Sequence, residues 1–408
     1  MSNKIIKLIQ DLNTGIRRIS LGNAMILFMS ILFAILLRLS LVDYKTLDFF
    51  TSLKPSYNAI SSICFSAFST NFSTYNPPYL YLLYVIARLF TNMPAVIAVK
   101  LPALVADFIC GYLVYRIVQT KYTATLLPLV AGMAVLFAPT VLLNSAFWGQ
   151  ADSLFTAGLL ACIYFLMEKE HSLAFFYFGI AMAFKLQAIF MVPLLFAFFL
   201  KNAISWKYFL IIPVVLILAL IPSWLAGRPI LDLLKIYLYQ YPQFQLPTIN
   251  AASIYSWLPA TEQVFNLLYI PGLLAGAIAG FFIVTIAYKC PNELSKSIIV
   301  ELALLATLVI PFFLPAMHEQ CFYPADIISI AFAFYYPEFF YIPILVGGVS
   351  FFSYQSFLFN EELVSLPILT LIVLIVIAIL VYHTLLQLYS SNININDNLL
   401  STQIQNDK

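Results

Sequence analysis

The sequence predicts an all-α polytopic membrane protein with about twelve transmembrane helices in a single domain, residues 21–388. Of the 408 residues, 62% are hydrophobic and 9% are charged, and the mean hydropathy is +0.95. A soluble domain requires a larger polar fraction to cover its surface. Apolar stretches of about 20 residues, the length that crosses a bilayer, recur almost from end to end. No separate soluble domain and no basic patch for nucleic acid is expected.

Apolar runs separated by polar or charged breaks define the candidate spans. They lie near 21–42, 97–119, 124–144, 152–167, 172–186, 187–200, 208–226, 266–288, 297–316, 322–336, 339–357 and 363–388. The pair 172–186 and 187–200 divides one apolar run at Lys185, and both halves are short for a bilayer core of about 30 Å. Such a broken pair is tolerated only beside protein or a wet cavity, which would place Lys185 in a cavity.

The remaining segments set the orientation of the chain. Tyr79–Phe90 is apolar but short and carries Arg88, which favours a helix lying in the membrane interface. With that helix horizontal and the basic segment 1–20 in the cytoplasm, the Lys- and Arg-bearing loops fall on the inner side, as the positive-inside bias requires. The outer side then receives about 43–96, about 227–265 and the corners 145–152 and 316–321, and the polar segment 389–408 forms a C-terminal tail.

Two acidic residues follow the first span. A carboxylate at the edge of an apolar site, here Asp43 or Asp48, can accept a proton from a hydroxyl nucleophile. The alternative is that both acids only mark the solvated end of a span. Their location at the membrane boundary predicts that one of these two acids is a general base if other polar groups lie close to it.

Polar groups also interrupt the chain at a tight corner and inside an apolar run. Trp148, Gln150 and Asp152 combine an aromatic face with an amide and a carboxylate, which suits a sugar or a lipid head group. The alternative is an interfacial tryptophan beside a helix cap. Lys185, with Gln187 close by, is an ionisable group within the membrane, so it either binds an anion, pairs, or extends to the interface.

A further polar corner, His318 followed by Glu319, lies between two late spans. Histidine can donate a hydrogen bond to a phosphate leaving group or, when protonated, neutralise it, and Glu319 could hold the ring in position. A solvated corner is the alternative. Arg228 could form a structural ion pair, and the five cysteines lack metal-ligand spacing and are expected to pack as small apolar residues.

Taken in order, these motifs resemble the GT-C class of membrane glycosyltransferases, and within it the prokaryotic relatives of the GPI-anchor mannosyltransferases of PIG-V type. The resemblance covers roughly residues 20–340 and no single motif decides it. It consists of an acid-bearing first outer loop followed by Tyr75–Tyr81 (YNPPYLY), Lys100–Asp107 (KLPALVAD), Asn144–Asp152 (NSAFWGQAD), Phe184–Gln187 (FKLQ), Asn250–Tyr255 (NAASIY) and Leu314–Asp326 (LPAMHEQCFYPAD).

The resemblance implies a sugar donor carried on a polyprenyl phosphate and an inverting transfer with a carboxylate base in the first outer loop. By position Asp48 matches that base better than Asp43. Relatives usually carry His-Glu-Arg where this chain has Gln320 in third place, so either Lys185 or Arg228 would supply the missing cation or the donor would differ. Asn250 is expected to help position the sugar or the acceptor.

The sequence thus predicts a hexosyltransferase, with mannose favoured, that acts at the outer face of a prokaryotic plasma membrane on a glycan, glycolipid or protein acceptor. Membrane lipid and the lipid-linked donor are its expected partners. No cofactor is required, with a divalent metal near Asp48 and Asp152 as the alternative. The alternative functions are a flippase or transporter of a lipid-linked saccharide, which would hold its polar groups at the bilayer midplane, and a glycan polymerase or ligase.

Overall fold

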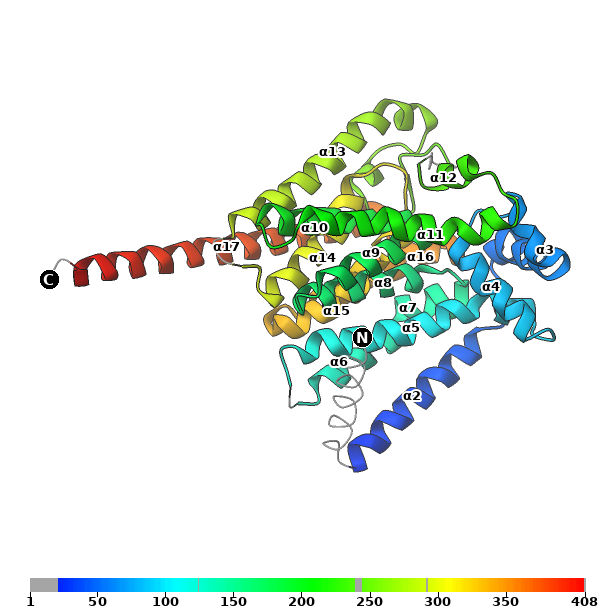
Figure 1. The fold of residues 1–408 in the computed structure, drawn as a ribbon, viewed down its shortest axis with the longest axis horizontal. Helices are drawn as coiled ribbons and strands as arrows, with labels where there is room; N and C mark the ends of the chain where they lie inside the picture. Colours follow the sequence, from blue (N-terminus) through cyan, green and yellow to red (C-terminus); the bar gives the residue numbers. More distant parts are fainter. Residues whose placement is uncertain (1–20, 124, 239–243, 291–292, 407–408) are drawn as a thin grey trace.

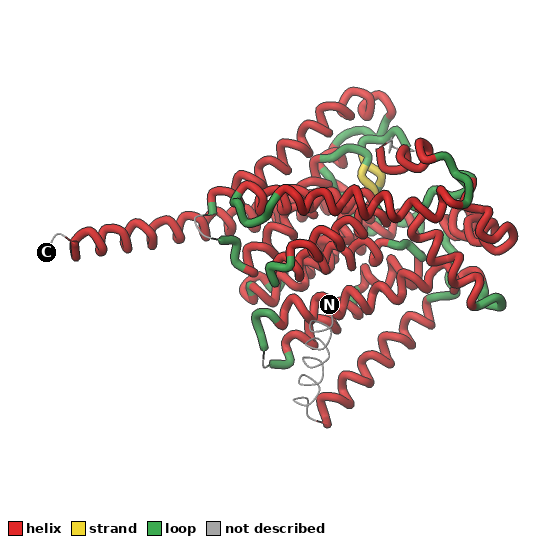
Figure 2. The backbone as a smooth tube through the Cα atoms, in the orientation of Figure 1, coloured by secondary structure: helices red, strands yellow, loops and turns green. Residues whose placement is uncertain are grey.

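The computed structural model describes residues 21–406 except 124, 239–243 and 291–292, and side chains from Gly22 to Gln387 outside these gaps. Helices make up almost all of the described chain, and one pair of two-residue strands is the sheet within it (Figure 2). In Figure 1 the long helices run side by side through the body, with α2 and α13 at opposite flanks and α17 projecting beyond it.

The helices of the bundle occur at every span that the sequence predicts. They are α2 (Leu21–Leu41), α5 (Ala95–Gln119), α6 (Leu127–Phe137), α7 (Pro139–Val141), α8 (Asp152–Met167), α9 (His171–Phe184), α10 (Val192–Leu200), α11 (Ile211–Leu225), α13 (Glu262–Lys289), α14 (Lys296–Phe313), α15 (Tyr323–Tyr335), α16 (Ile342–Leu358) and α17 (Leu366–Asn406). The last of these continues through most of the polar segment 389–408, so a regular helix extends there.

Shorter elements connect them. The α-helices α3 (Lys54–Ile63), α4 (Pro77–Leu89) and α12 (Ile230–Leu238) belong to the two long segments predicted to face outside. The π-helices are η1 (Phe49–Leu53) and η3 (Leu142–Trp148), and the 3-10 helices are η2 (Cys64–Ser69), η4 (Leu186–Met191), η5 (Trp206–Leu210), η6 (Ile254–Trp257), η7 (Glu319–Phe322) and η8 (Pro337–Phe339). The strands are β1 (Thr248–Ile249) and β2 (Met317–His318).

Seven helices in the described residues are long and apolar enough to cross a membrane, and an eighth crossing arises if the pair 127–137 and 139–148, bent by 44°, counts as one span. Asp152–Met167, His171–Phe184 and Leu186–Leu200 are apolar but shorter. Multiple apolar helices confirm a polytopic helical fold, whereas the count of twelve crossings and the horizontal position of Tyr79–Phe90 stay predictions. The predicted break at Lys185 is present, because α9 ends at Phe184 and Lys185 is extended.

Small residues allow helices to approach closely in the bundle. A Cβ added to Gly132 of α6 would lie 2.8 Å from the carbonyl oxygen of Gly111 in α5, and one added to Gly111 would lie 3.0 Å from that of Gly132. A Cβ added to Gly158 of α8 would likewise lie 2.8 Å from the Cβ of Ala181 in α9. Between membrane helices, which gain little from the hydrophobic effect, such close packing is the main source of association.

A buried polar network ties five elements together in the centre of the bundle. Arg38 of α2 donates through Nε to Asp107 of α5 at 2.9 Å, and both side chains are buried. Ser145 of η3 and Ser153 of α8 donate to the same carboxylate at 2.6 and 2.5 Å. The Ser153 hydroxyl also meets that of Tyr323 in α15 at 2.8 Å. Arg38 and Asp107 thus form a structural ion pair inside the bundle.

The loops predicted to be cytoplasmic meet at one end of the bundle. The loop between α8 and α9 joins the one between α13 and α14 through ion pairs Lys169–Glu293 and Glu168–Lys296, both 2.7 Å. The ammonium of Lys201 donates to the Cys290 carbonyl at 2.6 Å. These contacts gather basic residues from loops far apart in sequence at one end of the bundle, and the side of the membrane that this end faces stays a prediction.

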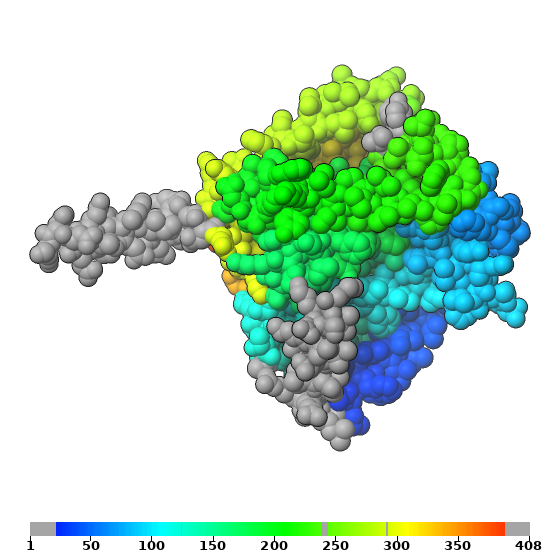
Figure 3. Space-filling view, viewed as in Figure 1, coloured from blue at the N-terminus to red at the C-terminus, as the bar shows by residue number. Residues whose placement is uncertain are grey.

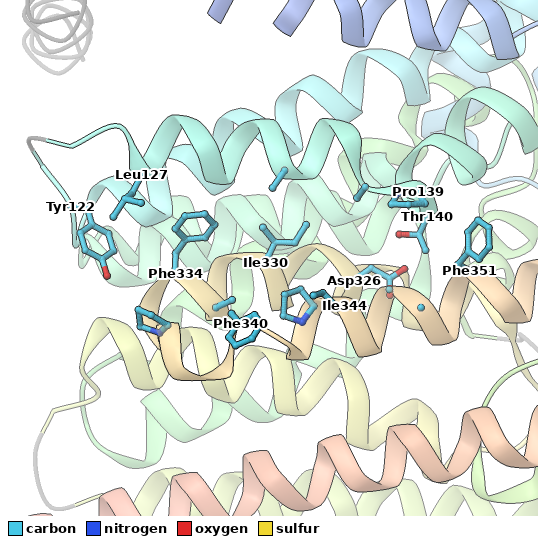
Figure 4. Close-up of a pocket in the computed structure, with 17 residues that line it drawn as sticks. Tyr122, Leu127, Pro139, Thr140, Asp326, Ile330, Phe334, Phe340, Ile344 and Phe351 are labelled. Carbon is cyan, nitrogen blue, oxygen red and sulfur yellow. The ribbon is translucent and has the colours of Figure 1, made fainter. Parts of the chain in front are cut away.

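An apolar cavity of about 770 Å³ lies between α6, α15 and α16 (Figure 4). Asp326 and Thr140 form its polar end, and the helix face at Gly347 and Gly348 leaves it open because nothing lies within 4 Å of a Cβ added at either. None of the described residues that line this cavity is a predicted site residue. Figure 3 shows a second hollow on the surface, between α13 and the face formed by α10 and α11.

Candidate functional site

Asp48 is held by the corner after η3. The indole Nε1 of Trp148 donates to Asp48 Oδ2 at 2.7 Å, and Gln150 Nε2 donates to the same oxygen at 2.8 Å. Asp48 immediately precedes η1 and is half-buried. Thr46 donates to the Trp148 carbonyl oxygen at 3.2 Å, which adds a second link between loop and corner. Two donors on one carboxylate oxygen fix its direction, and Oδ1 has no hydrogen-bond partner among the described residues.

Trp148 itself is buried, with 1% of its surface exposed. Its ring stacks on Phe357, with centroids 4.8 Å apart, and meets the edge of Tyr354 at 5.5 Å. The predicted stacking of Trp148 on a sugar ring therefore does not fit this structure, because protein side chains already cover the indole. Its indole N–H instead donates to Asp48.

Asp152 begins α8 and forms a buried ion pair with Lys185, the extended residue between α9 and η4. Asn144 Nδ2 donates to the other carboxylate oxygen of Asp152 at 2.9 Å. Asp152 is fully buried, whereas the Lys185 side chain is 25% exposed and its ammonium lies 5.7 Å from the centroid of the Phe155 ring. The ion pair thus holds the Lys185 ammonium beside the buried Asp152 carboxylate. Pairing was one of the alternatives predicted for Lys185, and it is confirmed.

The strand pair brings a third segment to the site. Ile249 pairs with His318 in the parallel strands, and Asn250 forms an isolated antiparallel bridge with His318. Asn250 adopts a φ of 54°, a left-handed conformation that asparagine tolerates better than most residues. The Phe244 ring lies 6.4 Å from the His318 ring. Residues about 70 apart in sequence are joined here.

Glu319 interacts electrostatically with Asp48, Asp152 and Lys185. Only 2% of its surface is exposed, and its Oε2 has no hydrogen-bond partner among the described residues. Burial raises the pKa of Glu319 to about 8, a backbone hydrogen bond opposes the shift, and the nearby charges of Asp48 and Asp152 add to it. Lys185 lowers it. Glu319 is therefore mainly protonated near neutral pH and can donate a hydrogen bond. No described hydrogen bond joins it to the His318 ring, so the predicted orienting role is not seen.

His318 is neutral in this environment. Burial lowers the pKa of His318 to about 4, the Lys185 charge contributes in the same direction, and Asp152 opposes both. Of the two roles predicted for this imidazole, the neutral hydrogen-bonding form therefore fits the structure, and the protonated form does not.

Three predicted residues lie apart from this cluster or only beside it. Asp43 is exposed at the end of α2, and its described electrostatic partner is Lys100. Arg228 follows α11, and its described electrostatic partners are Asp232 and Tyr81. Of the two cations proposed to replace the missing arginine, Lys185 is thus in the cluster and Arg228 is not. Gln187 is half-buried in η4, two residues after Lys185, with no described hydrogen bond.

Sequence reasoning missed Tyr75 and Asn144. Desolvation and then Tyr79 raise the pKa of Tyr75, and the charges of Asp48 and Asp152 also contribute, so its phenol lies near both acids. Both missed residues begin motifs that carry the GT-C resemblance, and that position was the available signal. In the described residues no three His, Cys, Asp or Glu side chains gather to hold a metal, so the metal alternative lacks a third acidic, thiol or imidazole ligand there.

No protein-family model matches the chain, and no curated protein sequence matches it. A solved structure does: ArnT from Cupriavidus metallidurans, determined with undecaprenyl phosphate bound, at a TM-score of 0.52 and 11% sequence identity. The match covers 88% of this chain and 77% of ArnT. The chain shares the ArnT fold. ArnT is a glycosyltransferase of the GT-C class, so the predicted GT-C-like fold is confirmed, while identity this low says nothing about substrate.

Proposed function

We propose that this protein is an inverting glycosyltransferase that moves a hexose, with mannose favoured, from a polyprenyl-phosphate sugar to an acceptor hydroxyl. The observation that carries the proposal is the orientation of Asp48, a half-buried carboxylate with one oxygen fixed by two donors and the other available. The shared fold with ArnT, which was solved with undecaprenyl phosphate, supports a lipid-linked donor.

Asp48 acts as the general base. Its Oδ1 takes the proton of the acceptor hydroxyl as the hydroxyl oxygen forms a bond to C1 of the sugar. The bond from C1 to the phosphate oxygen breaks on the opposite side, and its electron pair leaves with the lipid phosphate. Attack from the face opposite to the leaving group inverts the configuration at C1. Assistance of this kind contributes about 10²–10⁴-fold in rate.

Lys185 and His318 stabilise the departing phosphate. The Lys185 ammonium is anchored by Asp152 and its side chain is partly exposed, so it can face an anion without moving. Neutral His318 supplies an N–H donor rather than a charge. Protonated Glu319 can donate a further hydrogen bond. Donors that are fixed before the reaction stabilise developing charge at little reorganisation cost.

The site faces outward across the plasma membrane of a prokaryote in this proposal. The basic loops gather at the opposite end of the bundle, which supports that orientation. Nucleotide sugars are expected in the cytoplasm, so an outward site requires a donor that a lipid presents in the outer leaflet. Glycan, glycolipid or protein hydroxyls at the membrane surface are the candidate acceptors.

Asp48→Asn tests the proposal. The amide keeps the size of the side chain but cannot take the proton, so transfer of radiolabelled mannose from a polyprenyl phosphate to membrane acceptors should fall by about 10²-fold or more. Expression and helical content should not change. The matched control is Glu361→Gln, which neutralises an exposed acid in the loop between α16 and α17.

Full activity of the Asp48→Asn protein would remove Asp48 from the mechanism. The assay is run in detergent, where no sealed compartment exists, so a flippase would show no product. Mass spectrometry of the product then separates transfer of one hexose from transfer of an assembled chain, which a polymerase or ligase would give.

A further inference from the structure

Lys100 is a charged residue that the proposed chemistry does not use, and it is fully buried near the start of α5. Its Nζ lies 2.9 Å from the Val42 carbonyl oxygen and 2.7 Å from that of Tyr44. On its other side it lies 2.8 Å from the Ala146 carbonyl oxygen and 2.7 Å from that of Phe147. Four carbonyl groups thus surround one ammonium.

These carbonyls come from the ends of two different helices. Val42 and Tyr44 follow the last residue of α2, and Ala146 and Phe147 belong to the last turn of η3. Carbonyl groups at a helix C-terminus lack partners within the helix and carry partial negative charge. Asp43 interacts electrostatically with Lys100 but is exposed to solvent, and the buried Asp107 is paired with Arg38. The four carbonyl groups are therefore the hydrogen-bond partners of the Lys100 ammonium, which neutralises both helix ends.

Each helix end is followed in sequence by one partner of the hydrogen bond between Trp148 and Asp48. Asp48 lies four residues beyond Tyr44, and Trp148, its hydrogen-bond donor, follows Phe147. The Lys100 stem also packs against Gly149, where an added Cβ would lie 3.2 Å from Lys100 Cγ. Gly149 has a φ of 91°, a conformation that favours glycine. The lysine therefore fills the space between the first outer loop and the corner.

We propose that Lys100 is a positioning residue for Asp48, acting as a clamp that joins the first outer loop to the Trp148 corner. This inference rests on the proposed role of Asp48 as the general base. A buried ammonium is costly, and an apolar side chain would pack the same space without that cost. Unlike an apolar side chain, the lysine binds both segments at once. This fixes the distance between Asp48 and the donors that orient it.

The test is Lys100→Met, which keeps the length of the side chain and removes the charge. In a purified protein corrected for its folded fraction, kcat should fall by about 10²-fold, because a misplaced base loses about that much. The KM for the donor should stay within about twofold, since Lys185 and His318 are untouched. Lys121→Met is the matched control, because Lys121 donates to the Tyr335 carbonyl oxygen beyond the opposite end of α5.

A double variant separates positioning from folding. If Lys100 acts through Asp48, adding Lys100→Met to Asp48→Asn causes no further loss of kcat, whereas independent effects multiply. Lys100→Gln is the second variant if the methionine protein does not fold, because its amide still donates to two of the carbonyls and should give an intermediate kcat. Unchanged kcat in the folded Lys100 variants, or multiplicative loss in the double variant, would overturn the inference.

A readout without activity distinguishes failure of the clamp from failure of the proposed function. Trp206, Trp224 and Trp257 are exposed and can be replaced by Phe, which leaves buried Trp148 as the sole indole. In that background Lys100→Met or Lys100→Gln should shift the emission to longer wavelength and increase acrylamide quenching at least about twofold. An unchanged spectrum and quenching would contradict the clamp even if no sugar transfer were detected in any variant.

Discussion

At the residue scale, the environment of each titratable group decides its chemistry. Glu319 and Asp48 are carboxylic acids that lie close enough to interact electrostatically, yet Glu319 is buried and its pKa is raised to about 8, whereas Asp48 is half-buried and hydrogen-bonded by two donors. One acid can thus donate a proton to a hydrogen bond while the other accepts one. Two carboxyl groups in different environments are a recurring arrangement in acid–base catalysis.

The raised pKa of Glu319 predicts a pH-dependent stability. Its unfolded value is near 4.5, so the folded state holds the proton more tightly and the resulting stabilisation is complete below pH 4.5 and is lost as pH rises to about 8. Glu319→Gln removes this dependence. Thermal unfolding in detergent should therefore show the wild type losing stability relative to Glu319→Gln between pH 4.5 and 8. A constant difference across that range would refute the assignment.

The buried ion pair predicts a strong cost for removing one partner alone. Lys185→Met leaves the fully buried Asp152 carboxylate with Asn144 as its described donor, which should destabilise the protein by about 3 kcal/mol. Adding Asp152→Asn to that variant removes the uncompensated charge and should restore a large part of the loss. Midpoints of thermal unfolding in one detergent measure both effects, and equal midpoints for the single and double variants would contradict the pairing.

At the scale of elements, the site depends on how closely the helices pack. The bond between Arg38 and Asp107 joins α2 to α5, and the serines of η3 and α8 donate to the same acid. The corner that carries Trp148 thus lies against a rigid centre. The same centre depends on α5 and α6 crossing where Gly111 and Gly132 face each other.

Replacing Gly132 therefore tests the packing of the bundle. Gly132→Val places a branched side chain where even a Cβ would lie 2.8 Å from a backbone oxygen, so the two helices must separate. We expect a loss of roughly 1–3 kcal/mol, the usual cost of overpacking. Gly347→Val in α16 is the control, since nothing lies within 4 Å of its added Cβ. Similar unfolding midpoints for the two variants would show that the crossing is not close.

At the scale of the whole molecule, charge sorts the two ends of the bundle. Lys169 pairs with Glu293 where two predicted inner loops meet, while the first predicted outer loop reaches Trp148 at the other end. The cavity of about 770 Å³ among α6, α15 and α16 holds none of the clustered acids in its described lining. The clustered charges, and not that cavity, mark the candidate site.

Cysteine labelling tests which end faces outward. In a background with Cys64→Ser, Ser62→Cys in α3 should react with a membrane-impermeant maleimide on intact cells, because Ser62 is exposed in the first outer segment. Glu293→Cys, at a site that is 82% exposed in the opposite loop, should react only after the cells are permeabilised. Labelling of Glu293→Cys on intact cells would reverse the proposed orientation.

Hydropathy and charge determined the helices and their order, because each apolar run reports directly on the surroundings of its own segment. Even the break at Lys185 could be predicted, since a charge inside an apolar run is costly. Only the tertiary structure decided that Trp148 orients Asp48, that Asn250 meets His318, and that Arg228 stands apart. Those relations depend on the distances between segments, and distances follow from packing, which local composition does not record.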